Sequence, residues 1–118
     1  MLNSDGTSAK WHSDDFWKAV FNPSHEIHNQ PMGYLVSSFE FDKDWPTWER
    51  HPKGDEVVYC VSGEMEFVLE VGDEHKKVLL KPGELVVVPA NTWHTAKVKS
   101  AAKGLFVTFG EGTENRDV

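Results

Sequence analysis

Residues 49–63 read ERHPKGDEVVYCVSG, and the order of polar and apolar residues in this stretch decides the fold. Glu49 and His51 lie two residues apart, so on an extended strand their side chains share a face, with Cα atoms about 7 Å apart. The segment 52–55, which contains Pro and Gly, predicts a turn. That turn would bring Glu56, at the start of the next apolar run, back toward Glu49 and His51.

Short β-branched and aromatic runs continue from residue 32 onward, separated by Gly, Pro, Asp and Asn. They predict strands at 34–41, 47–51, 56–61, 64–71, 76–80, 85–88, 92–99 and 104–109. Ser62-Gly63 predicts a tight hairpin. No helical segment between these eight runs is long enough to connect two parallel strands. The pattern therefore favours an all-β antiparallel sandwich or barrel over residues 32–110.

The two ends of the chain differ from this pattern. Residues 1–31 are expected to form a mostly polar arm followed by one short helix at about 14–21, capped near Ser13 and stopped by Pro23. Four apolar groups share one stripe of that helix: Phe16, Trp17, Val20 and Phe21. The polar tail at 111–118 is expected to be a flexible end, or else to lie against the barrel mouth or a partner subunit.

A second informative segment, residues 81–94, reads KPGELVVVPANTWH. A strand that looks buried ends there in Pro-Ala-Asn, and His94 follows three residues after the turn. By itself, one histidine after a strand is a weak signal.

Taken together, the two segments resemble the motifs of the cupin superfamily. The first family motif is Gly, five residues, His-x-His, three or four residues, Glu, six residues, Gly; the second is Gly, five residues, Pro-x-Gly, two residues, His, three residues, Asn. The matching positions in this chain are Glu49, His51, Glu56 and Gly63 for the first motif, and Gly83, Pro89, Asn91 and His94 for the second. This resemblance implies an antiparallel double-stranded β-helix, also called a jelly roll or cupin barrel.

The chain departs from the family pattern at four positions. Glu49 replaces the first histidine, Lys43 the opening glycine, Asn91 the second-motif glycine and Val98 its final asparagine. Asn91 is a small change, because asparagine tolerates the left-handed backbone conformation better than most residues. The Glu49 substitution is the serious one, because it alters the expected ligand set.

The resemblance implies that Glu49, His51, Glu56 and His94 hold one divalent metal ion. Two carboxylates would neutralise a dication, and the added oxygen donor shifts preference toward Mn²⁺ or Fe²⁺ while imidazole keeps Zn²⁺ and Ni²⁺ open. Alternatively, Glu49 is a surface carboxylate or a general acid/base beside the metal, and Glu56 pairs with a neighbouring Arg50 or Lys53. As catalytic residues, we expect Glu49 or Glu56 to move a proton.

The leading functional hypothesis is a metal-dependent enzyme, either an oxygenase or an isomerase or lyase, acting on a small polar molecule that binds the ion through oxygen. The alternative is a non-catalytic module that binds or senses a sugar or organic acid. A metal-free epimerase-like protein would need a His/Asp or His/Tyr pair facing the pocket, and the sequence presents no clear pair. The fold does not choose among these chemistries.

Aromatic residues near the expected ligands divide into two groups. Strand alternation turns Trp48 and Trp93 away from the ligand face. Phe39, Phe41 and Phe67 are the expected apolar lining of a pocket.

Composition limits the partners. The chain has 118 residues and a formal net charge of −7, so we expect one domain that binds neither nucleic acid nor an acidic membrane surface. No apolar run approaches the ~20 residues of a membrane span, and the single cysteine, Cys60, requires no oxidising compartment. We therefore expect a cytoplasmic protein with a small-molecule ligand, and the resemblance implies a homodimer.

Overall fold

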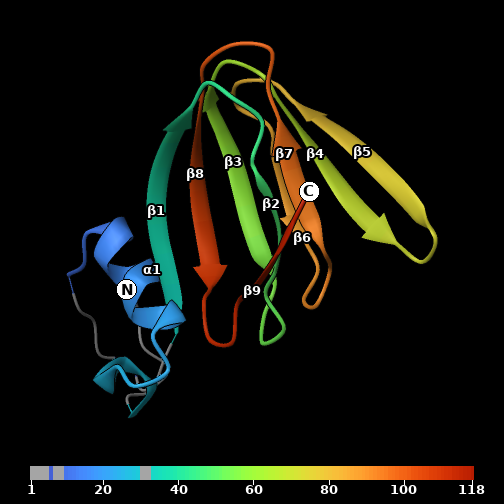
Figure 1. Cartoon of the computed structure of the whole chain (residues 1–118). Helices are drawn as coiled ribbons and strands as arrows, with labels where there is room; N and C mark the ends of the chain where they lie inside the picture. The colour runs from blue at the N-terminus through green and yellow to red at the C-terminus, as the bar shows by residue number, and fades with distance from the viewer. Residues whose placement is uncertain (1–5, 7–9, 30–32) are drawn as a thin grey trace.

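Two antiparallel sheets face each other in the computed structural model, which describes residues 6, 10–29 and 33–118 (Figure 1). The first sheet has the order β1 (Tyr34–Phe41), β8 (Ala102–Phe109), β3 (Glu56–Ser62) and β6 (Leu85–Val88). The second has the order β5 (Glu74–Leu80), β4 (Met65–Val71), β7 (His94–Lys97), β2 (Thr47–Arg50) and β9 (Glu114–Asp117). The expected all-β jelly roll with one short α-helix is confirmed.

The core lies between the two sheets because alternate residues of each strand point inward. In β4, Met65, Phe67 and Leu69 are buried, and in β8 the inward positions are Ala102, Gly104, Phe106 and Thr108. Cys60 belongs to the same buried cluster and is free.

All eight predicted strands are present, and six of them differ from the prediction at one or both ends, by one or two residues at each end. The strand expected at 92–99 is shorter, since β7 spans His94–Lys97, and the strand expected from 104 begins at Ala102.

The expectation of a flexible C-terminal tail was wrong for residues 114–117. They form β9, which pairs antiparallel with β2 from Thr47 opposite Asp117 to Arg50 opposite Glu114. A turn closed by the hydrogen bond from the Thr113 N–H to the Gly110 carbonyl redirects the chain. Without β9, one side of β2 would present unpaired backbone groups, which pairing satisfies.

Two turns depend on left-handed backbone conformations. Gly63 has φ 74° between β3 and β4, and a Cβ there would lie 2.5 Å from the Ala101 carbonyl oxygen. Asn91, which replaces the motif glycine, has φ 62°. Asparagine therefore fulfils the backbone requirement of the turn before β7.

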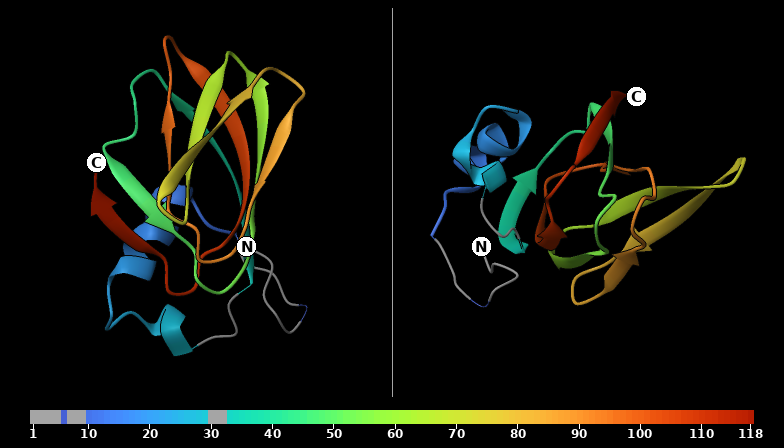
Figure 2. Two further views of the ribbon diagram at one scale, coloured as in Figure 1. Left: turned by 90° about the vertical axis from the view of Figure 1, so that its right-hand side faces the viewer. Right: turned by 90° about the horizontal axis from the view of Figure 1, so that it is seen from below.

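The N-terminal helix α1 (Ser13–Phe21) and the short 3₁₀ helix η1 (Glu26–Asn29) lie beside β1 (Figures 1 and 2). Their apolar residues form a second buried cluster consisting of Phe16, Ala19, Val20, Ile27 and Leu35. The helix begins one residue earlier than expected, since His12 is its N-cap and accepts from the Asp14 N–H. Most of the expected N-terminal arm lies outside the described residues. Neither helix in the described ranges has the length and apolar character needed to cross a bilayer.

Candidate metal centre

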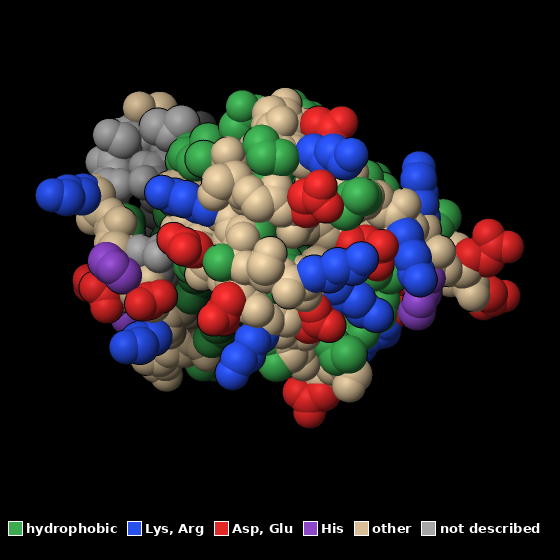
Figure 3. All heavy atoms as spheres, turned by 90° about the horizontal axis from the view of Figure 1, so that it is seen from above, with side chains coloured by type: hydrophobic (Ala, Val, Ile, Leu, Met, Phe, Trp, Pro, Cys, Tyr) green, Lys and Arg blue, Asp and Glu red, His purple; other side chains and the backbone are tan. Residues whose placement is uncertain are grey.

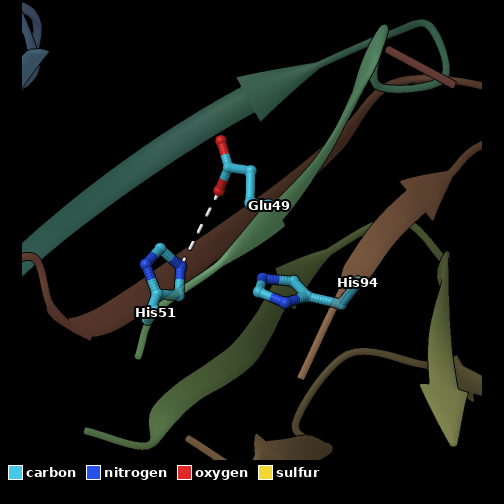
Figure 4. A group of neighbouring side chains, drawn as sticks. All are labelled: Glu49, His51 and His94. Carbon is cyan, nitrogen blue, oxygen red and sulfur yellow. Dashed lines mark ion pairs between the residues drawn. The ribbon is translucent and has the colours of Figure 1, made fainter. Parts of the chain in front are cut away.

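The four candidate ligands come from three strands that meet between the sheets. Glu49 lies on β2, directly opposite His94 at the start of β7. His51 follows β2, and Glu56 begins β3 on the other sheet. Figure 4 shows Glu49 and His51 on one side of the site and the His94 ring facing them from β7. The structure thus brings all four predicted residues together.

Glu56 lies between the two histidines. Its Oε1 is 3.1 Å from His94 Nε2, and its Oε2 is 3.3 Å from His51 Nε2. The Thr108 hydroxyl donates to Oε2 at 2.5 Å. Glu49 is more distant, with its Oε2 3.8 Å from His51 Nε2. Glu56 therefore holds the cluster together, while Glu49 borders it.

Hydrogen bonds fix which nitrogen of each histidine is free. The His94 Nδ1 lies 3.0 Å from the Thr92 carbonyl oxygen, which only accepts, so Nδ1 carries a proton. The Thr113 hydroxyl donates to the Gly110 carbonyl at 2.9 Å, so its oxygen accepts from His51 Nδ1 at 2.8 Å. In the neutral state both rings therefore direct an unprotonated Nε2 into the site.

Burial and mutual contacts shift the pKa values in the cluster. Burial alone would raise the pKa of Glu56, but its contacts with His51 and His94 lower it to about 2. Burial opposes the charged form of His94, yet the hydrogen bond with Glu56 raises its pKa. For Glu49, burial and the nearby negative charge of Glu56 raise the pKa. Glu56 is therefore firmly ionised, whereas Glu49 is biased toward the protonated form.

The donor set fits a divalent cation. His51 Nε2 is buried without a hydrogen-bond partner, and buried polar groups are normally satisfied. One ligand atom from each of Glu49, His51 and His94 lies within 4.8 Å of the others. Atoms bound about 2.1 Å from one ion lie at most about 4.2 Å apart, so small side-chain rotations would bring these three to coordination distance. A cation would satisfy the orphaned nitrogen.

A cavity of about 320 Å³ opens onto Glu49 and Glu56. The expected lining residues Phe39 and Phe41 are part of its wall. Phe67 is not among the lining residues, because it is fully buried in the core beside Trp45 and Phe106. Trp48 and Trp93 also lie outside the lining and instead stack with Arg116, as alternation predicts.

Sequence reasoning missed several residues of the site. Thr108 and Thr113 hold Glu56 and His51. The cavity lining also includes residues that were not expected there: Trp17 and Phe21 of α1, Glu40, Trp45 and Phe106. The period of two along β8 places Thr108 beside the inward Phe106 and could have revealed it. Thr113 lies in the C-terminal segment that was expected to be flexible, so nothing in the sequence indicated its contact with His51.

The fold and the site together define a small jelly-roll protein with a mixed histidine and carboxylate centre. The cupin domain family matches residues 39–109, more than half of the chain. The chain therefore belongs to the cupin family.

Solved structures agree with this assignment. A cupin superfamily protein from Desulfitobacterium hafniense is 25% identical, with a TM-score of 0.54 over 64% of this chain and 66% of that chain. Hydroquinone 1,2-dioxygenase from Sphingomonas is 16% identical, with a TM-score of 0.57 over 67% and 60%. An oxalate oxidase is 18% identical, with a TM-score of 0.60 over 72% and 47%. These likenesses establish the shared fold. Among curated protein sequences, none matches the chain.

Proposed function

We propose that this protein is a metal-dependent enzyme of the oxygenase or the isomerase or lyase type, acting on a small oxygen-bearing organic molecule. The observation that carries the proposal is the pair of buried histidines whose Nδ1 atoms are engaged in hydrogen bonds and whose Nε2 atoms lie beside two carboxylates. Glu49, His51, Glu56 and His94 are the proposed metal-binding residues. The similar structures with oxidative enzyme names, hydroquinone 1,2-dioxygenase and oxalate oxidase, add support for the oxygenase type.

The residues have different roles in this proposal. A bound ion, whether Fe, Mn, Zn or Ni, would polarise a substrate oxygen or bring substrate and O₂ together. Glu49, whose pKa is raised by burial, borders the cavity and is suited to hold or transfer a proton at its carboxylate oxygen. Glu56, whose pKa is lowered to about 2 by the histidines, stays ionised and orients both rings.

Metal titration of the whole chain tests the proposal. The protein, treated with a chelator and then dialysed, is titrated separately with Mn²⁺, Fe²⁺, Zn²⁺ and Ni²⁺ by calorimetry. We expect one ion per chain, with at least tenfold weaker binding in His94→Ala. His75→Ala, which changes a half-exposed histidine on β5, is the matched control and should bind normally. Equal binding by wild type and His94→Ala would overturn the metal centre.

A second candidate is the non-catalytic binding or sensing module. The contacts of Glu56 with Thr108 and His94 favour it, since they hold the Glu56 carboxylate in place without an ion. In that case the metal titration gives no uptake, while a small molecule still binds in the cavity.

We also propose a homodimer formed through the outer face of the first sheet. Two rows of directly opposed residues cross that face: Val36, Val107, Val57 and Val87 in one, and Ser38, Leu105, Tyr59 and Leu85 in the other. Seven of the eleven exposed large hydrophobic residues in the described chain lie on this sheet. An uncharged apolar surface of this kind is typical of protein–protein interfaces.

We also propose that the protein is located in the cytoplasm. Its free, buried Cys60 is compatible with a reducing compartment.

A further inference from the structure

Aromatic rings make up most of the wall of the cavity beside the metal centre. Six of its ten lining residues are aromatic: Trp17, Phe21, Phe39, Phe41, Trp45 and Phe106. The rings contact one another, with centroids 5.7 Å apart for Phe41 and Trp45, and 5.6 Å apart for Phe39 and Phe106. Flat apolar walls of this kind select flat apolar ligands, because ring faces and edges pack at such distances.

The polar lining of the same cavity is acidic. It consists of Glu49, Glu56 and the Thr108 hydroxyl, and no lysine or arginine of the described residues lines it. Glu40 also borders the cavity, but it is exposed and lies on the outer face of β1, opposite Lys103. The Thr108 proton is already donated to Glu56. A ligand hydroxyl group suits these carboxyl groups, because it can donate to an ionised carboxylate and can also accept from Glu49 in its protonated form. In the metal-free protein, a ligand carboxylate would be desolvated beside these carboxylates without a cationic partner, which is costly.

The cavity volume limits ligand size. Its volume is about 320 Å³, roughly twice the 150 Å³ engineered apolar cavity that is known to hold one benzene ring. One substituted ring therefore fits this space.

We propose that the cavity binds an uncharged, single-ring aromatic compound that carries a hydroxyl group, that is, a ligand of the phenol class and not an organic acid. This inference rests on the proposed function, since it narrows the substrate class of the same site. The ring lies among the aromatic walls formed by α1, β1 and Trp45, and the hydroxyl forms a hydrogen bond with Glu49 at the acidic end. A phenol hydroxyl is neutral at pH 7, because its pKa is near 10.

Binding of phenol, benzoate and benzylammonium tests the proposal, since the three probes share one ring and differ in charge. The readout is the indole N–H signals in ¹⁵N NMR spectra of the metal-free protein and of the Zn²⁺-loaded protein. We expect phenol to shift the signals of Trp17 and Trp45, which line the cavity, but not that of Trp93, which lies outside it. To the metal-free protein, phenol should bind at least about tenfold more tightly than benzoate.

Two variants make the test specific for charge. Phe21 lines the cavity and is 46% exposed, so Phe21→Arg places a cation there without disturbing the core. In the Phe21→Arg variant, the ratio of the affinities for phenol and benzoate should be smaller than in the wild type. The matched control is Val71→Arg, at a 55% exposed position outside the cavity lining, and it should leave the preference unchanged.

The outcomes separate this inference from the proposed function. Equal or tighter binding of benzoate or benzylammonium to the metal-free form, in a protein that takes up metal, would overturn the ligand class and leave the metal centre standing. Phenol binding in a protein that takes up no metal would support the ligand class and overturn the metal-dependent function. Failure of all three probes to shift Trp17 and Trp45 would overturn the inference in either case.

Discussion

At the scale of single residues, Thr113 determines how His51 is oriented in the candidate metal centre. Its hydroxyl donates to Gly110 and accepts from His51 Nδ1, which leaves Nε2 unprotonated. Residues that orient a ligand in this way usually affect metal affinity by about 10–100-fold when they are replaced. Thr113 is therefore a positioning residue, although it would not contact the ion.

We expect Thr113→Val to weaken metal binding by about 10-fold or more, because the variant cannot accept the Nδ1 proton. Thr113→Ser retains the hydroxyl and should restore most of the affinity. Calorimetric titration with Zn²⁺ measures the effect, and the melting temperature checks that the fold is intact. If Thr113→Val and Thr113→Ser lose affinity equally, packing of the threonine methyl group and not the hydrogen bond is responsible.

The lowered pKa of Glu56 predicts how the free energy of unfolding changes at acid pH. A carboxyl group whose pKa is lower in the folded state stabilises the fold above its ordinary pKa, and this contribution is lost as the pH falls toward the folded value. For Glu56 this window runs from the ordinary value of 4.5 down to about 2. One linked proton changes the free energy of unfolding by about 1.4 kcal/mol per pH unit.

Urea unfolding of metal-free protein between pH 5 and 3 should therefore show a steeper loss of stability for wild type than for Glu56→Gln. His94 does not confuse this comparison. Its raised pKa stabilises the fold below the ordinary value of 6.5, and that contribution is lost only as the pH rises through the raised value. Parallel stability profiles for the two proteins would show that Glu56 does not have a lowered pKa.

At the scale of elements, β9 connects surface contacts to the metal centre. Arg116 of β9 lies over the rings of Trp48 and Trp93, with its Cζ 5.3 Å and 4.5 Å from their centroids, and pairs with Glu70 of β4. Cation–π contacts of this kind contribute about 0.5–1 kcal/mol each at exposed positions. Because Thr113 immediately precedes β9, the docking of this strand supports the position of His51.

We expect Arg116→Ala to increase amide hydrogen exchange in residues 114–117 and to weaken Zn²⁺ binding, since both depend on β9 staying paired with β2. Lys97→Ala, at an exposed position at the end of β7, is the control. Faster exchange in β9 with unchanged Zn²⁺ affinity would show that the turn at Gly110 holds Thr113 without help from the strand.

These elements also show what the sequence could predict. Alternation and the turn at 52–55 were enough to bring Glu49, His51 and Glu56 together, and resemblance to the family motifs added His94. The sequence could not predict β9, because Glu114–Asp117 are all polar and exposed and pair through contacts with distant tryptophans. Likewise, the apolar stripe of α1 could be identified in the sequence. Its contact with the cavity could not, because that contact depends on where the helix packs against the barrel.

At the scale of the whole molecule, charged side chains are unevenly distributed over the surface. Side chains of both signs are spread over the end of the molecule seen in Figure 3, with hydrophobic side chains scattered among them. On the outer face of the first sheet, by contrast, the two rows carry no charge, and Glu40 opposite Lys103 lies at their end. Opposite charges at the edge of an apolar centre are typical of a self-complementary interface.

The size of this face also suits a dimer. Four strands about 4.8 Å apart and up to eight residues long span roughly 500 Å² in projection. Patches of this size lie at the upper end of what monomers expose, roughly 300–600 Å². They would form the apolar centre of an interface that buries about 800 Å² on each partner.

Light scattering after gel filtration should accordingly give a mass near 27 kDa, twice the 13.4 kDa of one chain. Leu105 lies on the central strand β8, directly opposite Tyr59 of β3, so Leu105→Glu would place a carboxylate at the centre of each copy of the interface. Twofold symmetry brings the two carboxylates close together, and we expect the variant to elute as a folded monomer. Val71→Glu, at an exposed position at the end of β4 in the other sheet, introduces the same charge outside the face and should stay dimeric. A wild-type mass of one chain at micromolar concentration, or dissociation caused equally by both variants, would exclude this face as the dimer interface.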